Sequence, residues 1–111
     1  MKASDYDLEL EELERKSVSR LLQADVLDRA AFDALYAYLC KKTVLIKHEH
    51  VVSKQVLAVL VNTPEIIRSR AEYLPEVREH KDLISKFAEL LGLIVRGEDC
   101  GDRQPGVPRI L

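Results

Sequence analysis

The stretch VVSKQVLAVLVNTP, at residues 51–64, constrains the fold more than any other part of the chain. It contains no charged residue between Val56 and Val61, so a helix formed here has no polar face. Such a helix has to be surrounded by other elements instead of lying against one. We therefore expect a central helix over residues 51–61, which ends at a corner formed by Asn62, Thr63 and Pro64.

Apolar residues recur at helical spacing on both sides of this stretch. Phe32, Leu35, Tyr36 and Leu39 fall at i, i+3, i+4 and i+7, and Ser4 with Asp7 has the spacing of a capping box. Thr43–Lys47 is rich in β-branched residues, but a lone strand would have nothing to pair with, so we expect helix there too. The predicted helices span residues 4–23, 28–47, 51–61, 64–73 and 75–91, with Gly92 ending the last.

These helices predict an all-α fold, a compact bundle of about five helices with an irregular C-terminal tail. A chain of 111 residues is the usual size of one domain, and its composition is 47% hydrophobic and 32% charged. We expect residues 1–95 to form a single helical domain. Residues 96–111 hold three of the four Gly and two of the four Pro, and they are expected to form a tail packed on the domain or on a partner.

The sequence favours a cytoplasmic protein. No basic region followed by an apolar one begins the chain, and no apolar run reaches the roughly 18 residues needed to span a membrane. Cys40 falls in a predicted helix and Cys100 in the polar tail, so no disulfide framework is expected. Cys40 is interpreted as a small buried residue, and the acidic neighbours of Cys100 make it a poor nucleophile.

The sequence does not predict an enzyme, and we expect no catalytic residue, cofactor or metal. It has no Gly-rich phosphate loop, no Gly-x-Ser-x-Gly elbow and no spaced pairs of cysteines. His48, Glu49 and His50 are potential metal ligands, but on a helix such closely spaced residues point to different faces.

A DNA-binding regulator is one alternative function. The helix that follows Asn62-Thr63 would carry Arg68 and Arg70 after a turn, in the outline of a helix-turn-helix. Nucleic acid is nevertheless an unfavoured partner, because the net charge is −2 and Glu65 and Glu72 would face phosphates.

Binding to another protein is the favoured function. A specific version is an inhibitor or immunity-type protein that blocks a basic toxin or enzyme through its acidic residues. His80, between Val77 and Ile84 on the apolar seam of the last helix, is a further candidate contact. A structural homodimer or adaptor is the second alternative. The predicted partner-binding residues are Glu9, Glu12, His80, Glu98, Asp99 and Asp102.

Overall fold

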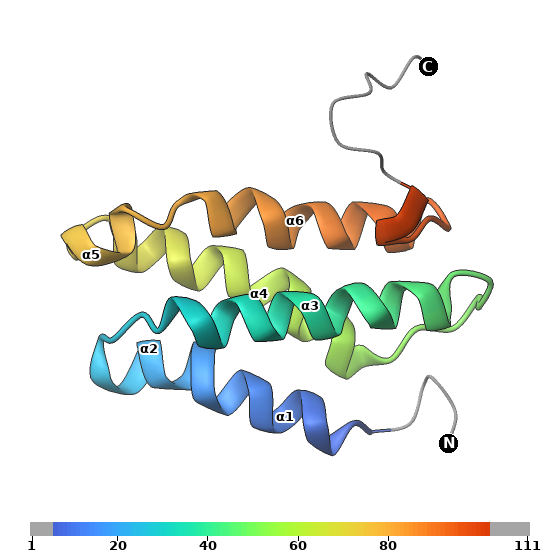
Figure 1. The fold of residues 1–111 in the computed structure, drawn as a ribbon, viewed down its shortest axis with the longest axis horizontal. Coiled ribbons are helices and arrows are strands. Elements are labelled where there is room, and N and C mark those ends of the chain that lie inside the picture. Colours follow the sequence, from blue (N-terminus) through green and yellow to red (C-terminus); the bar gives the residue numbers. More distant parts are fainter. Residues whose placement is uncertain (1–5, 103–111) are drawn as a thin grey trace, which may run out of the picture.

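The computed structural model describes residues 6–102 as an all-helical bundle without strands in that range, which confirms the predicted fold class (Figure 1). The first three elements join end to end, so they form one helical stretch over residues 8–24. The elements are α1 (Leu8–Glu14), the π-helical turn η1 (Arg15–Ser19), α2 (Arg20–Ala24), α3 (Arg29–Ile46), α4 (Lys54–Ala71), α5 (Pro75–Arg78), α6 (Asp82–Val95) and the 3-10 turn η2 (Cys100–Asp102).

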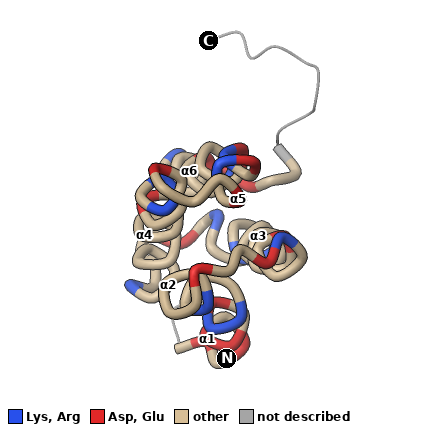
Figure 2. Tube along the Cα trace, turned by 90° about the vertical axis from the view of Figure 1, so that its left-hand side faces the viewer, with Lys and Arg blue, Asp and Glu red and all other residues tan. Residues whose placement is uncertain are grey.

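The long helices run alternately in opposite directions along the bundle. Figure 2 shows the α1–α2 stretch and α6 on opposite sides, with α3 and α4 between them. Helix α6 packs against both α3 and α4, and α1 packs against α3. The centre is closed by Phe87 of α6, whose ring meets those of Phe32 and Tyr36 edge to face, with centroids 6.4 and 5.8 Å apart.

Side chains cap the beginnings of three helices. The carboxylates of Asp7 and Asp28 accept from the N–H groups of Leu10 and Ala31, and the Ser53 hydroxyl accepts from Gln55. Each satisfies an N–H group that has no partner within its helix. The predicted cap Ser4 lies outside the described residues. The prediction that residues 43–47 are helical is confirmed as far as Ile46, where α3 ends.

The predicted corner at Asn62 is wrong, because α4 continues without a break from Lys54 to Ala71 and contains Pro64. A proline inside a helix removes one hydrogen bond and costs about 3 kcal/mol. Thr63, Pro64 and Ile67 are all buried on the side of α4 that faces the core. Keeping these three side chains in the core requires the helix to continue past Pro64, so packing outweighs the local signal for a turn.

The same helix corrects a second expectation, that residues 51–61 are enclosed on every side. Val56, Val59 and Leu60 are at most 2% exposed, but Ala58 lies on the surface and Val61 is 49% exposed. Helix α4 therefore has a core face and an outward face, and Ala58 and Val61 are its exposed apolar residues.

The single last helix predicted over residues 75–91 is two helices, α5 and α6, separated by residues 79–81. Pro75 does begin a helix, as predicted. Gly92 does not end one, because α6 continues to Val95 and Gly97 follows with a φ of 68°. That left-handed conformation is readily accessible to glycine, so the chain turns at Gly97 and residues 98–102 come back towards α3.

Candidate functional site

The structure does not bring the predicted acidic residues together. Glu9 and Glu12 lie on α1, whereas Glu98 and Asp99 follow α6, on the other side of α3 (Figure 1). Several of these carboxylates have partners inside the chain. Glu12 pairs with Arg15 and Lys16, Glu98 with Arg96 at 2.6 Å, and Asp99 with Lys47 at 3.3 Å. The side chain of Asp102 is outside what the structure describes.

His80 does not lie on a helical seam, because it falls in the break between α5 and α6. Its Nδ1 atom is 3.3 Å from Nη1 of Arg29. The Arg29 guanidinium also donates two hydrogen bonds of 2.9 Å to the Asp82 carboxylate, one from Nη1 and one from Nη2. Because Arg29 is at the start of α3 and Asp82 at the start of α6, this group joins two helix ends. His80 is half-buried beside that ion pair.

The two arginines of the DNA-binding alternative have partners within the chain. Arg68 pairs with Glu65, one turn away on α4. The Nε atom of Arg70 lies 3.4 Å from the Asp25 carboxylate, and its side chain is only 22% exposed. Since α4 has no turn at Asn62, the two-helix arrangement on which that alternative rested is absent.

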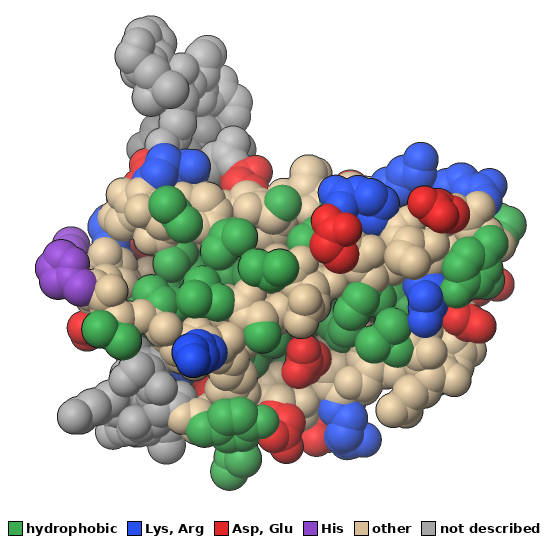
Figure 3. Space-filling view, turned by 180° about the vertical axis from the view of Figure 1, so that it is seen from behind, with side chains coloured by type: hydrophobic (Ala, Val, Ile, Leu, Met, Phe, Trp, Pro, Cys, Tyr) green, Lys and Arg blue, Asp and Glu red, His purple; other side chains and the backbone are tan. Residues whose placement is uncertain are grey.

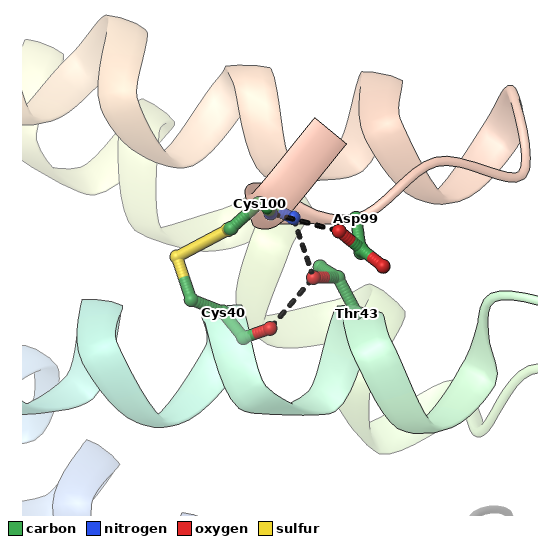
Figure 4. Close-up of a disulfide and its surroundings, with 5 residues drawn as sticks. Cys40, Thr43, Asp99 and Cys100 are labelled. Atoms are coloured by element: carbon green, nitrogen blue, oxygen red, sulfur yellow. Dashed lines mark hydrogen bonds between the residues drawn. A yellow bond between two sulfur atoms is a disulfide. The ribbon is translucent and has the colours of Figure 1, made fainter. Parts of the chain in front are cut away.

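Cys40 and Cys100 form a disulfide bond, which corrects the expectation that these cysteines do not pair (Figure 4). Thr43 supports the link from α3, because its hydroxyl accepts from the Cys100 N–H at 3.2 Å. The turn at Gly97 brings the two cysteines to a Cα–Cα distance of 5.6 Å across 60 residues of sequence. The cytoplasmic prediction rested partly on unpaired cysteines, and a disulfide is typical of oxidising compartments.

A buried polar network joins the beginnings of α1 and α4 to α3. Lys42 Nζ lies 2.6 Å from Asp7 Oδ2, and the Tyr38 hydroxyl donates to the same oxygen. The side-chain amide of Gln55 makes two 2.8 Å hydrogen bonds with the backbone N–H and C=O of Asp7. Only 9% of the Asp7 side chain and 11% of the Lys42 side chain are exposed, so this ion pair is shielded from water.

The network changes the protonation of its members. Burial alone would raise the pKa of the Asp7 carboxyl, but hydrogen bonds from Lys42, Tyr38 and Leu10 lower it from 3.8 to about 2. Burial and the Asp7 carboxylate raise the pKa of the Tyr38 hydroxyl above its ordinary value. Every charged group here has a partner within the chain, and this satisfied arrangement is typical of a structural clamp.

The outward face of α4 carries two exposed apolar residues between two charged ones. We define the α4 strip as Lys54, Ala58, Val61 and Glu65, which are all exposed. Their spacings of four, three and four residues place them along one side of the helix. Figure 3 shows this side of the molecule, where hydrophobic side chains gather along α4 and α6. Sequence reasoning missed the strip because it assigned the whole stretch to the core.

Among residues 6–102, no three His, Cys, Asp or Glu side chains are placed so that they could hold a metal ion. None of the helices in this part of the chain is long and apolar enough to cross a membrane. A comparison with protein-family models found no match to the chain, and comparisons with curated proteins and with solved structures found none either.

Proposed function

We propose that the chain is a protein-interaction module without a catalytic role, and that two copies of it pair through the α4 strip. The observation that carries this proposal is the exposure of Ala58 and Val61 in the middle of a long helix. Val61 leaves 49% of its surface in water, and Ala58 beside it offers no side chain that would hold a second helix away. A single exposed apolar residue would be ordinary, but here the apolar pair is flanked by opposite charges.

The strip is complementary to itself. Spacings of four, three and four residues form the seam along which two helices pack side by side. If two copies of α4 cross in opposite directions about the midpoint between Ala58 and Val61, each Ala58 faces Val61 of the other copy. The same two-fold axis places each Lys54 opposite Glu65 of the other copy, so both ends of the contact pair opposite charges. A parallel pairing would instead set Lys54 against Lys54.

The contact is narrow, which sets its expected strength. Its centre holds two small or medium apolar residues from each copy, and its ends hold exposed ion pairs that contribute about 0.2–1 kcal/mol each. Glu65 already pairs with Arg68 in the same helix, so this ion pair competes with the one that Glu65 would form with Lys54 of the other copy. We expect a reversible dimer that dissociates at micromolar concentrations, below the affinity of large obligate interfaces.

Sedimentation velocity over a range of micromolar concentrations tests this proposal. The unmodified chain should change from monomer to dimer as its concentration rises, and Val61→Asp should keep it monomeric because a charge would be buried in the contact. The matched control is Val44→Asp, the same change at a residue that is 57% exposed on α3. A monomer at all concentrations, or equal loss of pairing in both variants, would contradict the proposal.

The inhibitor hypothesis stays a prediction, with a smaller surface than the sequence indicated. Asp99 is largely covered and paired with Lys47, and Glu98 and Glu12 pair with neighbouring cations. Glu9 is the predicted acidic contact that is exposed on α1. Its neutralisation should weaken any complex with a basic partner, and salt should weaken that complex as well.

A further inference from the structure

A pocket of about 440 Å³ lies where the end of α4 meets α5 and the beginning of α6. Its volume falls within the range of sites that bind small molecules, roughly 300–1,000 Å³. The pocket is far from the disulfide and from the buried Asp7 network, which lie near the end of α3 and the beginning of α4. It is lined by Arg68, Ala71, Glu72, Arg78, Lys81 and Ile84.

Positive charge dominates the lining, because three cationic side chains face one carboxylate. Arg78 is held in position, since its Nε donates to the Ala71 carbonyl at 3.0 Å and another guanidinium nitrogen donates to that of Glu72 at 3.4 Å. Arginine has five N–H donors, so several remain for a ligand. Lys81 pairs with no carboxylate among residues 6–102. Figure 3 shows basic side chains gathered at this end of the surface.

The remaining lining is apolar. Ala71 is 6% exposed at the end of α4, and the half-buried Ile84 belongs to the first turn of α6. Both residues belong to or pack against the hydrophobic core. A ligand that fits this lining therefore needs an anionic group for the arginines and lysine, and a short apolar body for the alanine and isoleucine.

We propose that this pocket binds a small aliphatic carboxylate. The carboxylate lies between Arg78 and Lys81, where a guanidinium edge forms charge-assisted hydrogen bonds with both of its oxygens. The aliphatic chain covers Ile84 and Ala71 and leaves water. Arg68, which also pairs with Glu65, adds positive charge at the rim, and the Glu72 carboxylate offsets part of the positive charge of the lining. The site is separate from the α4 strip and does not depend on pairing of the chain.

Three probes divide the recognition into its parts. Octanoate carries both the charge and the chain, acetate the charge alone, and 1-octanol the chain without the charge. Isothermal titration calorimetry at low salt should show octanoate binding to the full chain at least about fivefold more tightly than either of the other two. Equal affinity for acetate or for 1-octanol would overturn the proposed recognition, and no heat with octanoate at millimolar concentration would overturn the site.

Substitutions of the lining residues test whether octanoate binds in this pocket. Lys81→Gln removes an unpaired cation and should weaken octanoate about fivefold, whereas Lys41→Gln, at an exposed lysine of α3, should leave it unchanged. Arg78→Gln should weaken it further, and a thermal melt of that variant separates loss of binding from loss of the hydrogen bonds that Arg78 donates to the Ala71 and Glu72 carbonyls. Ile84→Ser should weaken octanoate but not acetate. The monomeric Val61→Asp variant should bind octanoate normally, so failure of pairing and failure of this site are distinguishable. Unchanged octanoate affinity in Lys81→Gln and Arg78→Gln would contradict the assignment.

Discussion

Replacement of Asp7 by asparagine should remove part of the stability that the protein loses as the pH falls through the acid range. The pKa of this carboxyl falls from 3.8 to about 2 on folding, because Lys42, Tyr38 and the Leu10 N–H stabilise its charged form. A carboxyl whose pKa is lowered in the folded state stabilises that state above its unfolded pKa. That contribution disappears as the pH falls through the folded value.

The magnitude follows from the shift. A difference of about 1.8 pKa units corresponds to about 2 kcal/mol at neutral pH, from the 1.36 kcal/mol that one unit represents. At pH 2 less than about 0.5 kcal/mol of it remains. Asparagine keeps the shape of the cap but leaves Lys42 without its counter-charge, so Asp7→Asn should cost about 2 kcal/mol or more at pH 7.

Urea denaturation of both proteins at pH values from 7 to 2 measures this difference directly. The two curves of unfolding free energy against pH should converge between pH 4 and pH 2. Glu9→Gln is the matched control, because it removes an exposed carboxylate from the same helix and should change the unfolding free energy at pH 7 only slightly. A gap between wild type and Asp7→Asn that stays constant over this range would refute the ion pair as the origin of the stabilisation.

Two further changes test the architecture. The Cys40→Ser/Cys100→Ser variant should lose about 4 kcal/mol of unfolding free energy, the chain-entropy value for a link that spans 60 residues. Reduction of the wild type should lower its melting temperature to that of the variant, and an unchanged melting temperature would contradict the link. Leu60→Asp should prevent folding, because Leu60 is 1% exposed and an unpaired buried charge costs several kcal/mol against a total of roughly 5–15 kcal/mol; a folded variant by circular dichroism would refute the assignment of α4 to the core.

The helices of this fold could be predicted where a local pattern and the core require the same thing. Phe32, Leu35 and Leu39 recur at helical spacing, and all three are at most 1% exposed in α3. The cap at Asp28 agrees with that pattern, because a short polar side chain precedes the first apolar turn. In such segments the local sequence pattern and the packing of the core both favour the same helix.

Other features depend on contacts between distant residues, which no local pattern contains. Asn62, Thr63 and Pro64 are typical of a turn, but the burial of Thr63 and Pro64 beside Ile67 favours an unbroken α4. Gly97 turns the chain and thereby makes the pairing of Cys40 with Cys100 possible. The exposure of the α4 strip could not be predicted either, because apolar side chains on an exposed helix face have the same sequence pattern as those of a core.

Reversal of the two charges at the ends of the α4 strip tests self-pairing most directly. Lys54→Glu places two glutamates opposite each other in a pair of identical copies, and Glu65→Lys places two lysines opposite each other, so each variant alone should be monomeric in sedimentation velocity. An equimolar mixture of the two should form a heterodimer, because each end then joins a glutamate to a lysine. A mixture that stays monomeric while the unmodified chain dimerises, or single variants that pair as well as the unmodified chain, would contradict antiparallel pairing through α4.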